Sequence, residues 1–157
     1  MTTEELTTLV KKIVIEASSL SKTHTNENNA PVNYTCIFAQ SNEEYEELLE
    51  VSSQIGQIVH ETATGPVFKI KPITTVSGEL RILKIRRPDP KRPERGDADF
   101  TVADYELFKK TYLGKPGFDI IKRPEMEMIE LLDQSYNVLA YYSHPILASV
   151  LKINLDE

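Results

Sequence analysis

The chain has 157 residues, of which 40% are hydrophobic and 27% are charged, and its formal net charge at pH 7 is −6. This length suits one domain with a full core, and the composition is that of a globular protein rather than a disordered or membrane-spanning one. The acidic balance argues against electrostatic binding to nucleic acid or to an anionic membrane, because both need clustered positive charge. We therefore expect a single domain, residues 1–157, that binds neither.

Residues 1–30 predict an amphipathic helix followed by a polar loop. Apolar residues recur at helical spacing from Leu6 to Leu20, and Thr2 with Glu5 forms a capping box. Acids precede the apolar positions and no continuous apolar run follows, which is unlike a signal peptide. Cys36 is the only cysteine, so it cannot form an intramolecular disulfide. Together these features predict a cytoplasmic location.

Residues 31–87 predict a strand, a helix and three further strands. β-Branched and aromatic residues indicate the first strand at 32–39, and Ser41 caps a helix that ends at Gly56. Three strand-like segments follow at 57–61, 66–71 and 79–87.

Residues 88–96 are a proline-rich linker, because several prolines in so short a span exclude both a helix and a central strand. The linker region concentrates basic residues: Arg86, Arg87, Lys91, Arg92 and Arg95. No aromatic residues are interleaved with them for stacking on bases, so a nucleic-acid-binding arm is disfavoured.

Residues 97–144 repeat the order of the first unit. A strand is predicted at 97–102, Asp104 caps a helix that ends near Gly114, and three strands follow at 118–122, 125–132 and 136–143. The tail, residues 145–157, is compatible with a short helix or a strand. The predicted fold class is α+β, with two consecutive βαβββ units forming a cupped mixed sheet behind the N-terminal helix.

Three short motifs carry a resemblance to a known family. Residues 33–38 (NYTCIF) look like a DHICF motif, residues 83–90 (LKIRRPDP) replace a strand ending in ELP, and residues 96–102 (GDADFTV) replace EHAEFVV. With the two βαβββ units, these motifs resemble the vicinal oxygen chelate superfamily, which includes glyoxalases, extradiol dioxygenases and antibiotic-resistance proteins. Within it, the chain is most similar to the YecM-like family of uncharacterised proteins.

The resemblance implies a site at which metal ligands have been replaced. Metal-dependent members use His or Glu on the first and last strands of each unit, and those positions hold Tyr34, Arg86 and Asp97 here. Arginine has no lone pair to offer, tyrosine is a rare ligand, and one aspartate does not hold a divalent ion. The expectation is therefore no metal and no cofactor.

Strand alternation predicts which side chains share the cup. Asp97 and Asp99 lie on the face opposite Ala98 and Phe100, and Lys84 and Arg86 point the same way as each other. The predicted ligand-binding residues are Tyr34, Lys84, Arg86, Asp97 and Asp99. Their basic members suit a small carboxylate or phosphate. In the competing interpretation, Arg86 and Asp97 pair to stabilise the sheet and Tyr34 is a core residue.

Other candidate sites have little support. The three histidines, His24, His60 and His144, lack metal-ligand spacing, and no phosphate loop, nucleophile elbow or cysteine pair is present. Glu130 is a candidate acid or base, and the sequence leaves open whether Glu130 or His60 faces the pocket.

Three functions remain open. The first is a metal-independent protein that binds a small anion. The second is a metal-independent isomerase or lyase for a small oxygenated substrate, with Asp97 or Glu130 as base. The third is an interaction or scaffold protein that uses the N-terminal helix or the linker. The sequence also leaves open that the protein forms a homodimer.

Overall fold

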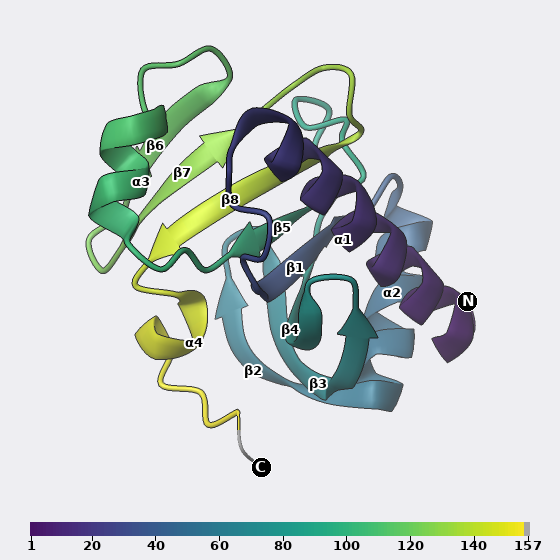
Figure 1. Ribbon diagram of the computed structural model, residues 1–157. Coiled ribbons are helices and arrows are strands. Elements are labelled where there is room, and N and C mark those ends of the chain that lie inside the picture. Colours follow the sequence, from purple (N-terminus) through teal and green to yellow (C-terminus); the bar gives the residue numbers. More distant parts are fainter. Residues whose placement is uncertain (156–157) are drawn as a thin grey trace.

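Two copies of one strand–helix–three-strand unit are joined edge to edge in a single sheet (Figure 1). The computed structural model describes residues 1–155. The first unit contains β1 (Val32–Phe38), α2 (Asn42–Ile55), β2 (Gly56–Thr62), β3 (Gly65–Thr75) and β4 (Gly78–Arg86). The second contains β5 (Gly96–Phe100), α3 (Tyr105–Tyr112), β6 (Phe118–Lys122), β7 (Glu127–Leu131) and β8 (Val138–His144).

The strand order repeats on the two sides of a central seam. Within residues 1–155 the sheet has eight strands in the order β2-β3-β4-β1-β5-β8-β7-β6. The first and last strands of each unit pair in parallel, β1 with β4 and β5 with β8, while β1 and β5 pair antiparallel across the seam. This arrangement confirms the predicted α+β fold of two βαβββ units.

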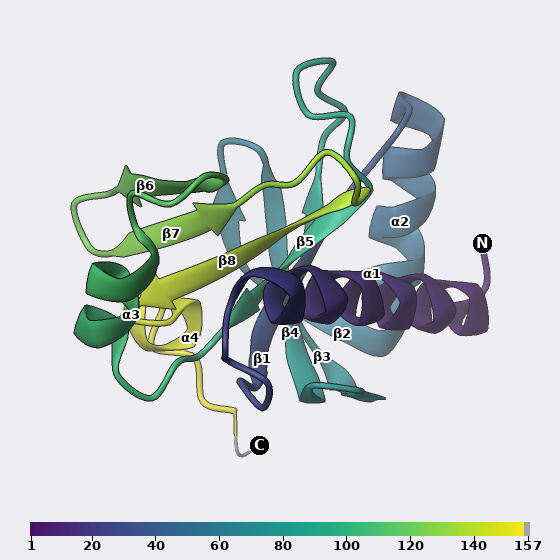
Figure 2. The same cartoon turned by 45° about the horizontal axis from the view of Figure 1, so that its top comes forward.

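Three helices cover one face of the sheet. The N-terminal helix α1 (Thr3–His24) lies along the middle of this face, with α2 over the first unit and α3 over the second (Figures 1 and 2). The predicted caps are present: the side chains of Thr2, Ser41 and Asp104 accept hydrogen bonds at the starts of the helices. The apolar stripe of α1 is buried in the main core, which leaves it no free apolar face for a partner. The stripe consists of Leu6, Val10, Ile13, Val14, Ala17 and Leu20.

Several boundaries differ from the sequence prediction for local reasons. β5 begins at Gly96, inside the predicted linker, because Gly96 already pairs with Ile37 on β1. A Cβ at Gly96 would lie 2.3 Å from the Cys36 carbonyl oxygen, so this pairing requires glycine. The same strand ends at Phe100 rather than residue 102. β7 starts at Glu127 rather than residue 125, because Arg123 N donates to Met126 O and closes a turn.

The opposite face is the cup face, which we define as the side that carries the second apolar cluster of the sheet. Its strand residues are Tyr34, Cys36, Phe38, Val67, Ile82, Leu139 and Tyr141. The tail forms a short helix, α4 (Leu147–Val150), and then crosses this face. Lys69 Nζ donates to Asn154 O, and an Arg81 nitrogen donates to Leu155 O at 2.9 Å, so the tail is tied to β3 and β4. No helix within residues 1–155 combines the length and hydropathy of a membrane span.

Candidate functional site

The five residues predicted for the site all lie on the cup face. Cys36 is the register partner of both Asp97 on β5 and Lys84 on β4, while Tyr34 is opposite Asp99. Arg86 is opposite Phe38 on the next row. Because register partners on neighbouring strands point to the same side of a sheet, these side chains share one face, as the alternation predicted.

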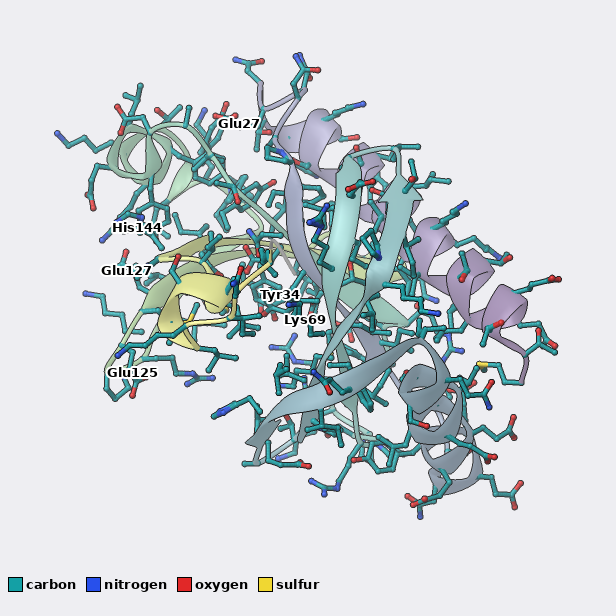
Figure 3. All side chains as sticks on the ribbon, turned by 90° about the horizontal axis from the view of Figure 1, so that it is seen from below. Glu27, Tyr34, Lys69, Glu125, Glu127 and His144 are labelled. Carbon is teal, nitrogen blue, oxygen red and sulfur yellow. The ribbon has the colours of Figure 1, made fainter. Side chains whose placement is uncertain are left out.

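A cavity of about 510 Å³ opens on this face between the two units; we call it the cup cavity. Tyr34, Lys84 and Arg86 line it, whereas Asp97 and Asp99 do not. Figure 3 places Tyr34 near the middle of the molecule, between the α4 segment and the strands of the first unit. The other lining residues are Thr62, Ala63, Thr64, Val67, Arg92, Ile121, Arg123, Met126, Met128, Tyr141 and Leu147.

Among residues 1–155 the cavity lining holds four basic side chains and no acidic one, in a chain whose net charge is −6. Two of the four are already paired. Arg86 forms an ion pair with Asp89 at 3.1 Å and lies 5.1 Å from the centre of the Phe38 ring. Arg92 pairs with Glu130 at 3.1 Å. Lys84 and Arg123 make no ion pair within residues 1–155, so both are available to an anion.

Asp97 is a buried carboxyl group that makes no hydrogen bond within residues 1–155. It is 6% exposed, and its Oδ1 atom is fully buried with no partner in the described part of the chain. Burial raises its pKa to about 8; the nearby Asp99 carboxylate adds to the rise, and Lys84 and Arg86 oppose it. The interpretation that Arg86 and Asp97 pair is wrong. Arg86 pairs instead with Asp89, because the linker turns directly after β4 and brings Asp89 back to it.

Asp99 has a structural role. It accepts hydrogen bonds from Ser143 N at 3.1 Å, from Ser143 Oγ, and from Asn33 Nδ2 at 3.0 Å. Burial raises its pKa to about 6, and these three bonds oppose the rise. Asp99 therefore fastens β5 to β8 and, like Asp97, is not among the residues that line the cavity, so its part in ligand binding stays a prediction.

Sequence reasoning missed a hydrogen-bonded group that borders the cavity. The Tyr141 hydroxyl donates to Glu130 Oε2 at 2.6 Å, and Arg92 contacts the same oxygen. Glu130 is thus buried behind two lining residues, while His60 lies exposed on β2, an edge strand. β8 is the last strand of the second unit, and the resemblance places site residues on the last strand of each unit. The alternation of Leu139, Tyr141 and Ser143 along β8 is the signal that could have identified Tyr141 as a site residue.

Comparisons with known proteins identify the fold. No family model matches the chain, and no curated protein matches it. A solved structure described as structural-genomics Protein EC4020 is similar with a TM-score of 0.74 and 13% identity, over 95% of this chain and 91% of that one. The two proteins share their fold. At this level of identity the likeness extends to the fold alone, which is the arrangement that the vicinal oxygen chelate resemblance implied.

Two more distant structures were also found. Methylmalonyl-CoA epimerase from Mycobacterium tuberculosis has a TM-score of 0.47 and 10% identity, over 76% of this chain and 91% of that one. A mutant of 4-hydroxymandelate synthase from Streptomyces coelicolor has a TM-score of 0.35 and 10% identity, over 78% of this chain and 50% of that one. Neither likeness is strong enough to transfer a function.

The residues at the positions where the resemblance implied metal ligands do not fit a divalent cation. Tyr34, Arg86 and Asp97 occupy three of these positions, and Tyr141 occupies the cup face of the remaining strand, β8. Burial raises the pKa of both tyrosines, so they stay protonated, and two basic side chains lie beside the one carboxyl group. Within residues 1–155 no group of three or more His, Cys, Asp or Glu side chains is placed to hold a metal ion.

Proposed function

We propose that this protein binds a small anion with an apolar body, such as a medium-chain carboxylate or a phosphate ester, in the cup cavity. We further propose, from its three short motifs, that it is related to the YecM-like proteins. The observation that carries the binding proposal is the cavity lining, which in the described part of the chain has four basic side chains and no acid. A volume of about 510 Å³ is within the range of small-molecule sites.

The lining combines polar and apolar parts. The first unit contributes Lys84, Arg86 and the hydroxyl-bearing turn at residues 62–64. The second unit contributes Arg123 and Tyr141 together with the apolar side chains of Ile121, Met126 and Met128, and the tail contributes Leu147. A ligand that satisfies both parts has an anionic group and several carbon atoms, because an anion alone would leave the apolar wall unused.

The test is calorimetric titration of the full chain with acetate, hexanoate and inorganic phosphate, with hexylamine as the charge-reversed probe. Hexanoate is expected to bind more tightly than acetate, and hexylamine is expected not to bind. Lys84→Gln should weaken hexanoate binding by about tenfold, because it removes an unpaired charge from the cavity. Lys12→Gln, an exposed lysine on α1, is the matched control and should bind as the wild type does.

Two results would reject the proposal. One is that no anion binds to the wild-type protein. The other is that Lys84→Gln and Lys12→Gln bind hexanoate equally well, which would place the anion outside the cup cavity.

A second candidate function is proton transfer on a small oxygenated substrate. The observation that favours it is Asp97, a buried carboxyl group with a pKa of about 8 and no hydrogen bond to any residue that the structure describes. Glu130 is a weaker candidate for the base, since Tyr141 and Arg92 already hold it. The test is solvent deuterium incorporation into a panel of 2-oxo acids, followed by NMR. Exchange that is lost in Asp97→Asn supports proton transfer, and no exchange in any panel member rejects it.

A further inference from the structure

We infer that an anion bound in the cup cavity is accompanied by a proton taken up at Asp97, so that Asp97 sets the affinity for the anion at alkaline pH. This inference rests on the proposed function. Asp97 lies in a row between Leu139 on β8 and Cys36 on β1, and Cys36 is followed in the same row by Lys84 on β4.

This row lies against the cavity. Lys84 at one end of it lines the cavity, as do Tyr34 and Tyr141 on the adjacent row. Asp97 therefore lies on the cup face, close to side chains that would contact the ligand. Its charge interacts with the charges of Lys84 and Arg86, although it makes no ion pair with either within residues 1–155.

Asp97 and Asp99 are two similar carboxyl groups that differ in their hydrogen bonding. Both are on β5, both point to the cup face, and both are buried. Asp99 accepts three hydrogen bonds and thereby joins β5 to β8 and to Asn33. Asp97 accepts none in the described part of the chain, so hydrogen bonding in the fold does not account for a carboxyl group at this position. A buried carboxyl group without a partner is costly when it is charged.

The ionisable groups around Asp97 come from every strand that packs against it. They are Tyr34 and Cys36 on β1, Lys84 and Arg86 on β4, Asp99 on β5, Glu130 on β7 and Tyr141 on β8. Burial raises the pKa of Tyr34, Cys36 and Tyr141, so these three remain neutral. Lys84 and Arg86 are the groups that stabilise a charged Asp97.

An anion that binds to Lys84 competes with Asp97 for the same positive charge. The charged form of Asp97 then loses stabilisation and gains repulsion, so the neutral form is favoured. One anion binds and one proton is taken up from solvent, and the Asp97 carboxylate becomes a carboxylic acid. By linkage, the neutral carboxyl and the bound anion favour each other equally.

The affinity for the anion should therefore fall as the pH rises above the pKa of Asp97. Below the pKa of about 8, Asp97 is already neutral in the free protein, and the affinity does not depend on its titration. Above that pKa, the anion binds only as a proton is taken up. The affinity then falls by up to about tenfold per pH unit until the pKa of the complex is reached.

The experiment is calorimetric titration of the full chain with hexanoate at pH 7, 7.5, 8.5 and 9, in two buffers of different ionisation enthalpy. Hexanoate keeps its charge throughout this range. For the wild-type protein we expect equal affinity at pH 7 and 7.5, a three- to tenfold loss by pH 9, and proton uptake at pH 8.5. Asp97→Asn should bind with the same affinity at pH 7 and 9, while Asp119→Asn, an exposed control on β6, should follow the wild type.

The outcomes separate the two proposals. Hexanoate binding with no pH dependence, with no proton uptake, or with the same slope in Asp97→Asn overturns this inference and leaves the proposed function standing. No binding at any pH overturns both. The proton count uses the wild-type protein alone, so it decides the question even if Asp97→Asn does not fold.

Discussion

Cys36 and Asp97 are register partners across the antiparallel β1–β5 pair, the seam between the two units. Both are buried on the cup face, and burial raises the pKa of each. Asp97 also lies near the carboxylate of Asp99, with Lys84 and Arg86 opposing the effect of burial. The seam thus carries a carboxyl group whose titration should affect folding as well as binding.

Asp97→Asn should change the pH dependence of stability. The folded protein keeps a proton on Asp97 up to a pKa of about 8, whereas the unfolded chain releases it near 3.8. Between these values the folded state binds more protons, so its stability falls as pH rises, by at most about 1.4 kcal/mol per pH unit. Urea unfolding at pH 5, 7 and 9 measures this. The free energy of unfolding of Asp97→Asn should rise relative to that of the wild type as the pH increases towards 8. A constant difference would contradict the assignment.

Tyr141→Phe should destabilise the fold by leaving Glu130 with one polar partner fewer. Glu130 is 8% exposed, and the tyrosine hydroxyl is 2.6 Å from its Oε2. Loss of a hydrogen bond to a buried charged group costs about 1.5–3 kcal/mol. The control is Tyr136→Phe, which removes an exposed hydroxyl bond to Thr23 and should cost below about 0.5 kcal/mol. Equal unfolding free energies for the two variants would exclude a special role for the Glu130 group.

Ile13→Ala should destabilise the protein strongly, while Ile15→Ala on the same helix should not. Ile13 is 2% exposed and packs in the core beneath α1, whereas Ile15 is 52% exposed. Truncating a buried isoleucine to alanine lowers the free energy of unfolding by about 2–5 kcal/mol, whereas truncating an exposed one changes it by less than about 0.5 kcal/mol. Chemical denaturation measures both. Similar costs would mean that α1 does not pack against the sheet as described.

Met128→Ala should lower the preference for longer carboxylates. Met128 lines the apolar side of the cup cavity, and each methylene that a ligand buries contributes about 0.8 kcal/mol. Hexanoate binding should weaken while acetate binding stays the same, as measured by calorimetry. Leu107→Ala, an exposed apolar residue on α3, is the control. An unchanged hexanoate-to-acetate ratio would place the carbon chain elsewhere.

Local sequence signals determined the order of the elements. The caps at Thr2, Ser41 and Asp104 start helices where predicted, because a cap and an apolar period of about 3.6 act between near neighbours. Strand alternation likewise set the faces of Tyr34 and Asp97, since a period of two does not depend on distant residues.

The partners of these side chains were decided only by tertiary structure. Arg86 pairs with Asp89 rather than Asp97, and Tyr141 meets Glu130 across β7 and β8. The first contact depends on the turn that follows β4, and the second on the register of β7 against β8, which makes Glu130 and Tyr141 direct partners. The alternation identified one face of the sheet. Which of its residues border the cavity, and that Asp97 is left without a hydrogen bond within residues 1–155, followed from packing of the whole chain.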